Sequence, residues 1–195
     1  MNRSRRLSEL TIALRGRTAA TTVSEPAGPA FFGMAEIAAR AAETTRYLSP
    51  EVDLDGAVLL ETGDVVVALL DKIGASAVIN AQTAGSVLGR ECVALRITSP
   101  ELRPAWLSEW TGSAEFKSQA AQHVGGTTMP RLPLKALWSF SVTPPSVEDQ
   151  VALEELANRF DAAIATTATT LHDLQRLRAA EMQLVLAKTQ PADTP

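Results

Sequence analysis

The side chains best suited to binding chemistry lie close together between Lys117 and Arg131. They carry the cationic, amide, imidazole and hydroxyl groups that contact phosphates and base edges in DNA. Gly125 and Gly126 allow the backbone to adopt positive φ and to approach a ligand closely. The candidate DNA-binding residues of this stretch are Lys117, Gln119, Gln122, His123, Thr127, Thr128 and Arg131.

Two loop cations, Lys72 and Arg90, lie beside glycines and complete the candidate set. We expect the cations and threonine hydroxyls to contact phosphates, and the two glutamines to contact base edges. A solvated helix face followed by an ordinary turn would carry the same residue types. His123 fits a capping or surface position better than a base contact.

Catalytic chemistry has little support in the sequence. The chain has two histidines and one cysteine, without the spacing of a metal site. A phosphate-binding loop, a glycine-rich cofactor loop and the Asn/Asp-Pro-Pro-aromatic motif typical of amino-methyltransferases are all missing. Asp64 follows Gly63 but has no downstream Glu-x-Lys, so a turn residue explains it better than a nuclease carboxylate. We therefore expect a non-enzymatic chain without cofactor or metal.

Length and composition indicate one domain with an appendage. The chain has 195 residues, of which 46% are hydrophobic, enough for a core. Its apolar runs are shorter than the roughly 18 residues of a membrane span, and its N-terminus lacks the pattern of a secretory signal. We expect a cytoplasmic protein in which Cys92, the single cysteine, is a small core residue.

Charge is distributed unevenly around a net value of −4. Residues 48–70 contain five acidic and no basic side chains, and residues 146–195 contain eight acidic and four basic ones. Residues 1–47 and 71–145 each have a basic excess. Nonspecific affinity for nucleic acid should therefore be weak, and a DNA-binding role would require a partner that supplies more positive surface.

The hydrophobic pattern predicts an α+β domain of mixed order. We expect a basic lead-in over 1–25, with a short helix over Leu7–Leu14, and a domain over 26–145 that begins near Phe31–Ala39. One helix should begin at Ser99-Pro100-Glu101, another should span Ser113–His123, and Trp106, Trp110 and Trp138 should lie in the core. The expected strands are Val65–Leu70, Ala77–Asn80, Cys92–Ile97 and Trp138–Val142.

A helix of unusual length is expected after the Pro144-Pro145 pair. No proline or glycine interrupts 146–189, and such a helix would extend about 60 Å. Its apolar stripe requires a second helix to cover it, which favours a coiled-coil arm; packing against its own domain is the alternative. A disordered tail is expected over 190–195. The stripe consists chiefly of Leu153, Leu156, Phe160, Ile164, Leu171 and Leu174.

Two motifs resemble the specificity (S) subunit of Type I restriction-modification systems. In that family a target recognition domain ends in G-T/S-x-x-P-x-L, an apolar strand, and P-P-x-x-E-Q before a long helix. Asp149 occupies the usual Glu position here, and Gly63-Asp64 before an apolar strand is a second shared feature. The first motif is matched by Gly126, Thr127, Thr128, Pro130, Leu132, Pro144, Pro145 and Gln150.

The resemblance implies a recognition subunit that works with other proteins. Full-length S subunits resemble two tandem copies of this unit, with the two long helices paired antiparallel. One copy is seen here, so we expect a half-subunit that forms a homodimer through 146–189. The implied partners are double-stranded DNA, a methyltransferase (modification) subunit and a restriction subunit, which would carry out the chemistry.

Two features depart from the family pattern. The Ala/Thr-rich N-terminus lacks the usual helix pattern, and the acidic segment 48–70 is unusual for a surface that faces DNA. These departures allow an alternative, in which the chain is a DNA-recognition or adaptor subunit of another phage-defence complex and acts through protein–protein contacts. Sequence-specific DNA binding separates the alternatives.

Overall fold

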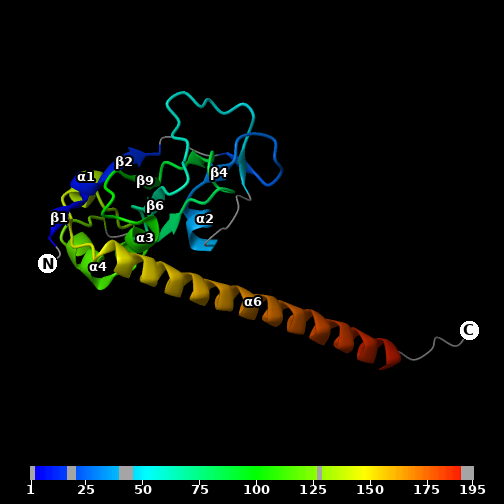
Figure 1. Ribbon diagram of the computed structural model, residues 1–195. Helices are drawn as coiled ribbons and strands as arrows, with labels where there is room; N and C mark the ends of the chain where they lie inside the picture. Colours follow the sequence, from blue (N-terminus) through cyan, green and yellow to red (C-terminus); the bar gives the residue numbers. More distant parts are fainter. Residues whose placement is uncertain (1–2, 17–20, 40–45, 127–128, 190–195) are drawn as a thin grey trace, which may run out of the picture. The chain divides into compact units, whose positions relative to one another are not determined.

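The chain forms two compact units, Met1–Val151 and Ala152–Pro195. The computed structural model describes residues 3–16, 21–39, 46–126 and 129–189, with side chains described as far as 183. All of its strands and all helices but the last lie in the first unit (Figure 1). The predicted class, a mixed α+β domain followed by a long C-terminal helix, is confirmed.

A four-stranded antiparallel sheet forms the centre of the first unit. Its order is β2 (Thr11–Arg15), β9 (Cys92–Ile97), β6 (Val65–Ala68) and β7 (Ser76–Val78). Every residue of β6 is buried, which explains its continuous apolar run without polar alternation. The predicted strand over Cys92–Ile97 is confirmed. The other two were nearly right, since β6 ends two residues early and β7 is shifted toward the N-terminus.

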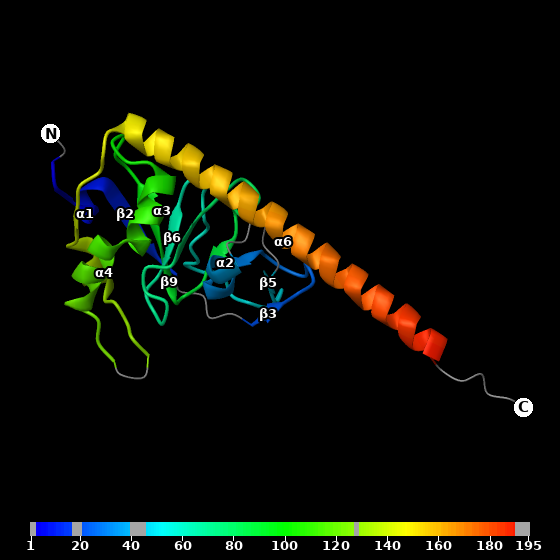
Figure 2. The same ribbon diagram turned by 90° about the horizontal axis from the view of Figure 1, so that it is seen from below.

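Helices cover both faces of this sheet. Val65 and Val67 point into a core with the helices α3 (Pro104–Gly112), α4 (Ala114–Ala121) and α5 (Leu134–Trp138). The alternating residues Val66 and Ala68 contribute to a second core beside α2 (Met34–Ala39). Figure 2 shows α3 and α4 on one side of β6 and β9, and α2 on the other.

Three short strand pairs complete the fold. They close the N-terminal segment against α5 and connect the α2 region to the sheet. The first pair, β1 (Arg5–Arg6) with β10 (Ser141–Val142), is antiparallel, as is β3 (Thr22–Val23) with β5 (Tyr47–Leu48), whereas β4 (Phe31–Phe32) and β8 (Val87–Leu88) pair parallel.

The expected basic lead-in is instead part of the domain. The predicted helix over Leu7–Leu14 is confined to α1 (Leu7–Leu10), and the chain then enters β2. Leu7 and Leu10 are completely buried in the core. Thr11 ends the helix, because it adopts an extended conformation and its hydroxyl donates to the Leu7 carbonyl oxygen at 3.0 Å. The predicted boundary near residue 26 was therefore wrong.

Two predicted elements near the tryptophans were also wrong. The helix expected from Pro100 begins at Pro104, and residues 99–103 form a turn and an extended segment. The strand expected over Trp138–Val142 is reduced to β10, because helix-forming residues after Pro133 build α5 instead. Trp138 is 40% exposed and is no core residue. The other two tryptophans stack at a centroid distance of 6.5 Å, and Trp110 is buried.

Part of the acidic segment is neutralised inside the domain. Asp64 is 1% exposed and accepts two hydrogen bonds from the Arg96 guanidinium, one from Nε and one from Nη2, each at 2.9 Å. The same guanidinium contacts Glu61 at 2.6 Å, and the Glu61 backbone N–H donates to Asp64. Asp64 is thus a turn residue that fixes the entry to β6, as expected. Two of the five acidic residues in 48–70, Glu61 and Asp64, are therefore ion-pair partners of Arg96 in β9.

Replacement of Arg96 by methionine should destabilise the domain strongly. The Asp64 carboxylate would stay buried without its guanidinium partner, and we expect the free energy of unfolding to fall by about 2–3 kcal/mol. Urea titration followed by tryptophan fluorescence measures this change. Arg5→Met is the matched control, since its ion pairs with Glu9 and Glu101 are exposed and should contribute much less. Equal losses for the two variants would contradict the prediction.

The last helix, α6 (Val147–Thr189), is attached to the domain by its first turn. Ser146 caps it, because its hydroxyl oxygen accepts the Asp149 backbone N–H at 3.1 Å. Gln150 is completely buried: its Oε1 accepts the Arg103 N–H at 2.9 Å, and its Nε2 donates to the carbonyl oxygens of Glu101 at 2.8 Å and Pro145 at 3.0 Å. The glutamine of the Pro-Pro motif therefore joins α6 to the segment that leads into α3.

Beyond this turn, α6 carries an exposed apolar stripe. Four threonines in its middle donate their hydroxyls to the carbonyl oxygens four residues earlier, at 2.8–3.1 Å. The expected tail over 190–195 lies outside the described residues. No described helix is long and apolar enough to cross a membrane. The exposed stripe residues are Leu153, Leu156, Phe160, Ile164, Leu171, Leu174, Leu177 and Met182.

Candidate nucleic-acid interface

A hairpin-like loop connects α4 to α5 and contains the Gly-Thr motif. Gly125 and Arg131 exchange both backbone hydrogen bonds, at 3.2 and 3.0 Å, and so close the loop. Gly126 has a φ of 94°, a conformation that favours glycine. Thr127 and Thr128, the predicted phosphate contacts, lie outside the described residues. Figure 2 shows the two limbs of this loop extending beyond α4.

The base of the loop is fixed to the end of β6. The Asp71 N–H donates to the Pro130 carbonyl oxygen at 3.0 Å, and the Leu132 N–H donates to the Leu69 carbonyl oxygen at 2.9 Å. Leu132 is completely buried, which anchors the returning limb in the core. Asp71 adopts a positive φ of 56° in the adjoining turn. The loop therefore emerges from a rigid base.

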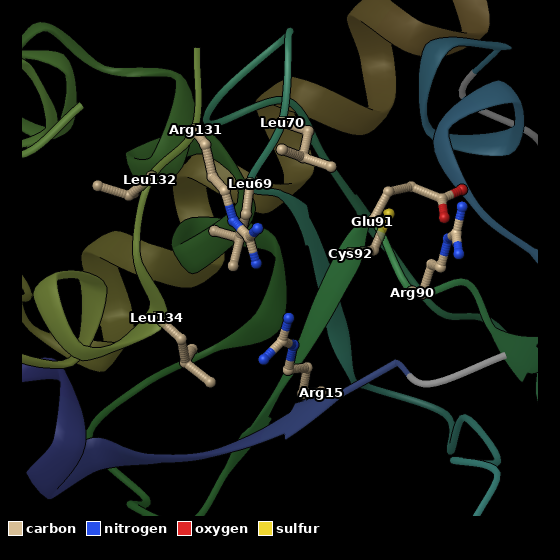
Figure 3. Close-up of a pocket in the computed structure, with 9 residues that line it drawn as sticks. All are labelled: Arg15, Leu69, Leu70, Arg90, Glu91, Cys92, Arg131, Leu132 and Leu134. Carbon is tan, nitrogen blue, oxygen red and sulfur yellow. The ribbon is translucent and has the colours of Figure 1, made fainter. Parts of the chain in front are cut away.

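A small pocket lies where this limb meets the sheet. The ends of β2, β6 and β9 supply one side and the 131–134 segment supplies the other. In Figure 3 the guanidinium groups of Arg15 and Arg131 point toward one another, whereas Arg90 lies beyond Cys92, next to Glu91. The pocket is lined by Arg15, Leu69, Leu70, Arg90, Glu91, Cys92, Arg131, Leu132 and Leu134.

The electrostatics of the pocket are strongly cationic. Arg15 and Arg131 face one another across the pocket and Arg90 lies at its edge next to Glu91; within the described part of the chain none of the three arginines makes an ion pair. The acid, Glu91, accepts the backbone N–H of Met34 at 3.5 Å, at the start of α2. Its carboxylate is thus directed toward that helix. An anionic ligand would find more donors than competitors here.

Two neighbouring groups do not supply reactive chemistry. Burial raises the pKa of the Cys92 thiol far above its usual range, so this thiol is inert. Burial alone would raise the pKa of Glu36, but hydrogen bonds from Arg46 and the Gly33 N–H outweigh it and lower this pKa. Among the described residues no group of three or more potential metal ligands occurs. The predicted core position of Cys92 is confirmed.

The predicted DNA-binding residues fall into two neighbouring groups. Arg90 and Arg131 line the pocket, and Lys72 is exposed in the turn whose Asp71 contacts Pro130. The second group is exposed on α4 and at its end, just before the loop. His123 stacks on the Phe140 ring at a centroid distance of 6.1 Å, which agrees with a surface role. This second group consists of Lys117, Gln122 and His123.

Gln119 has a structural role that its sequence context did not reveal. Its Nε2 donates to the Ser141 carbonyl oxygen and its Oε1 accepts the Ser141 N–H, each at 2.8 Å. This paired contact holds β10 against α4 and fixes the plane of the amide. We therefore remove Gln119 from the candidate base-reading residues.

Arg15 is the pocket residue that sequence reasoning missed. It ends β2, a strand that was expected to be a lead-in, and its place beside Arg131 depends on pairing between β2 and β9. The available signal was the Arg-Gly-Arg at 15–17 directly after the apolar stretch Ile12–Leu14, because a glycine beside a strand can mark the close approach of a ligand or of another backbone segment. The register that pairs Arg15 with Val93 places it at the end of the sheet where Cys92 lines the same pocket.

Comparison with known proteins identifies the fold. A chain from a structural study of complex assembly and conformational transition in the type I R-M system matches 91% of this chain with a TM-score of 0.62 and 21% identity. The S subunit of the Type-I restriction-modification system from M. genitalium matches 96%, with a TM-score of 0.65 and 13% identity. The HsdS subunit from Thermoanaerobacter tengcongensis matches 84%, with a TM-score of 0.59 and 20% identity.

These matches confirm the predicted resemblance at the level of fold. The chain has the fold of about half a specificity subunit, a mixed α+β domain with a long C-terminal helix. It spans less than half the length of each solved chain, covering 44%, 46% and 38% of them. No protein-family model and no curated protein matches the sequence.

Proposed function

We propose that the chain is a non-catalytic, sequence-specific DNA-recognition subunit of a Type I-like restriction-modification complex. One observation carries this proposal: the half-subunit fold extends over 84–96% of the chain. Partner proteins would supply methylation or cleavage, while this chain would place them on DNA. A methyltransferase subunit is the first partner and a restriction subunit the second.

The cationic loop region supports DNA as the ligand. A projecting loop on a rigid base suits entry into a groove, since rigid support limits the conformational entropy lost on binding. Lys72, Arg90 and Arg131 lie around its base, and Lys117 and Gln122 lie on the helix that leads into it. The cations and the hydroxyls of Thr127 and Thr128 would contact phosphates, and Gln122 would be available for a base edge.

A second copy of the chain is the proposed partner of α6. Large apolar side chains 47–61% exposed recur along the helix, and a surface of this kind marks an interaction site. Two seven-residue series define its centre: Leu153, Phe160, Thr167 and Leu174, and Leu156, Ala163, Thr170 and Leu177. Residues spaced in this way form the seam of a coiled coil.

The side-chain sizes favour antiparallel pairing in one register. Leu153 would meet Leu177 of the second copy, and Leu156 would meet Leu174. Phe160, the bulkiest residue of the seam, would face Thr170, whereas parallel pairing would place Phe160 against itself. The last pair of facing seam residues would be Ala163 and Thr167, which are both small. The Thr167 hydroxyl already donates to a carbonyl oxygen of its own helix at 2.8 Å.

Flanking residues agree with the same register. Arg159 would lie beside Asp173 of the second copy, and the two-fold symmetry creates this opposite-charge pair twice. Ile164 would meet its own counterpart at the two-fold axis, and Leu171 would cover Ala157. The first turns of the two helices would then be about 45 Å apart along the axis, since about 30 residues separate them at 1.5 Å each.

A two-fold dimer would read a two-part palindromic DNA site, because each copy presents the same loop. Selection of bound duplexes from a random-sequence pool by the full-length chain tests this prediction. We expect enrichment of two inverted half-sites at one fixed spacing. A single enriched motif without an inverted copy would contradict the dimeric reading. Failure to enrich any sequence, with or without a co-purified methyltransferase, would contradict DNA recognition and favour the adaptor alternative.

A further inference from the structure

The arginine pocket is built on fixed backbone. A Cβ at Gly16 would lie 2.0 Å from the Gly89 carbonyl oxygen, so only glycine permits this close approach directly after Arg15. The Gly16 N–H also donates to the Cys92 carbonyl oxygen at 3.3 Å. On the opposite side, Leu132 and its hydrogen bond to Leu69 hold the backbone that carries Arg131. The two guanidinium groups therefore face one another from rigid supports.

The charge of this pocket is left without a partner in the described chain. Two partly buried arginines elsewhere are paired with acids: Arg5 with Glu9 and Arg96 with Glu61. In the pocket, by contrast, the acid Glu91 is bonded to the start of α2. Clustered like charges repel, and a planar guanidinium matches the oxygens of a phosphate group with two parallel donors. The leucine walls lower the local dielectric constant and strengthen such contacts.

We infer that this pocket binds one phosphate group, with Arg15 and Arg131 donating from its two sides and Arg90 adding positive charge at its edge. The inference rests on the proposed function for the source of that group, a backbone phosphate of duplex DNA. Because phosphates are the same in every sequence, the pocket supplies affinity and orientation without sequence preference. It lies at the base of the Gly125–Arg131 loop and so sets where the loop meets the bases.

The test compares paired arginine substitutions in the full-length chain. Binding of a fluorescently labelled random-sequence duplex is measured by anisotropy at several KCl concentrations. Arg15→Gln with Arg131→Gln should weaken binding about tenfold or more and reduce the salt dependence by about one phosphate contact. Arg6→Gln with Lys135→Gln removes the same charge from exposed positions outside the pocket lining and should change binding much less. Circular dichroism and thermal unfolding show whether each variant is folded.

The outcomes separate this inference from the proposed function. If the wild-type chain binds duplex and the two double variants weaken it equally, the pocket is not a phosphate site, although DNA recognition stands. If neither the wild type nor the variants bind duplex, the pocket is tested by thermal unfolding of the wild type and of the pocket variant in the presence of inorganic phosphate. Stabilisation of the wild type that the pocket variant loses would support a phosphate site with a free phosphate group as ligand. Absence of stabilisation would overturn the inference.

Discussion

Replacement of Gln150 by leucine is expected to lower the free energy of unfolding by about 3–5 kcal/mol, the largest effect of any single change considered. The buried amide satisfies three backbone groups, and leucine can satisfy none of them. The Arg103 N–H and the carbonyl oxygens of Glu101 and Pro145 would lose these partners. Urea unfolding monitored by tryptophan fluorescence measures the loss, because all three tryptophans lie in the first unit.

Two further variants isolate the hydrogen bonds of Gln150 from its packing. Glu148→Leu changes an exposed residue of the same turn and should leave stability nearly unchanged. Gln150→Glu keeps the shape, but an ionised carboxylate cannot donate to the two carbonyl oxygens, and a protonated one can donate to one of them. The loss of unfolding free energy of Gln150→Glu relative to the wild type should therefore become smaller as the pH falls. A loss below about 1 kcal/mol for Gln150→Leu would contradict this account, since it would equal one ordinary hydrogen bond.

Cysteines introduced together at Leu153→Cys and Leu177→Cys are expected to link two chains completely under oxidising conditions. In the proposed antiparallel register the thiol introduced at position 153 of one chain lies opposite the thiol introduced at position 177 of the other. Two disulfides therefore form per dimer. Leu153→Cys alone should remain unlinked, because its counterpart lies near the opposite end of the paired segment. Cys92 is completely buried and does not compete. Non-reducing electrophoresis measures the linked fraction, and linkage of Leu153→Cys alone would indicate parallel pairing.

Molar mass by light scattering tests the same dimer without cysteines. Phe160→Glu places a charge in the centre of the seam and should convert the dimer to a monomer, because an unpaired buried charge is costly. Ala162→Glu is the matched control, since it lies about 200° around the helix from Phe160. These substitutions preserve the first turn of α6, whereas truncation at Pro145 would remove Gln150. A wild-type chain that is monomeric would contradict self-pairing and leave another protein as the partner of α6.

The parts of the fold that sequence could predict are those with a local signal. Cys92–Ile97 is a run of apolar residues interrupted by Arg96, and Ser146 with Asp149 forms a recognisable helix start. Trp138 was misjudged because aromatic and β-branched residues indicate a strand, whereas the preceding Leu134–Leu137 segment forms a helix against the core. Here tertiary packing overrode a local pattern.

The types of residue in the candidate site could be predicted from the sequence, but which of them lie together in the fold could not. Arg90 and Arg131 are 41 positions apart in sequence and share a pocket because β9 pairs with β6, whose end holds Leu132. Arg15 joins them through another distant pairing, and a single sequence holds no signal of its register. Gln119 shows the opposite case, since its residue type suits base reading while its amide is engaged by Ser141.

The threonine-rich middle of α6 affects the solubility of the chain before it assembles with a partner. Before the chain assembles, the apolar stripe of α6 is exposed to solvent and to other proteins. A stripe made entirely of leucine would promote aggregation. Alanine and threonine at the centre reduce the exposed apolar area, while eight acidic against four basic residues over 146–195 give this segment a negative net charge that favours solubility. We expect the free chain to remain dispersed at concentrations where an all-leucine version precipitates.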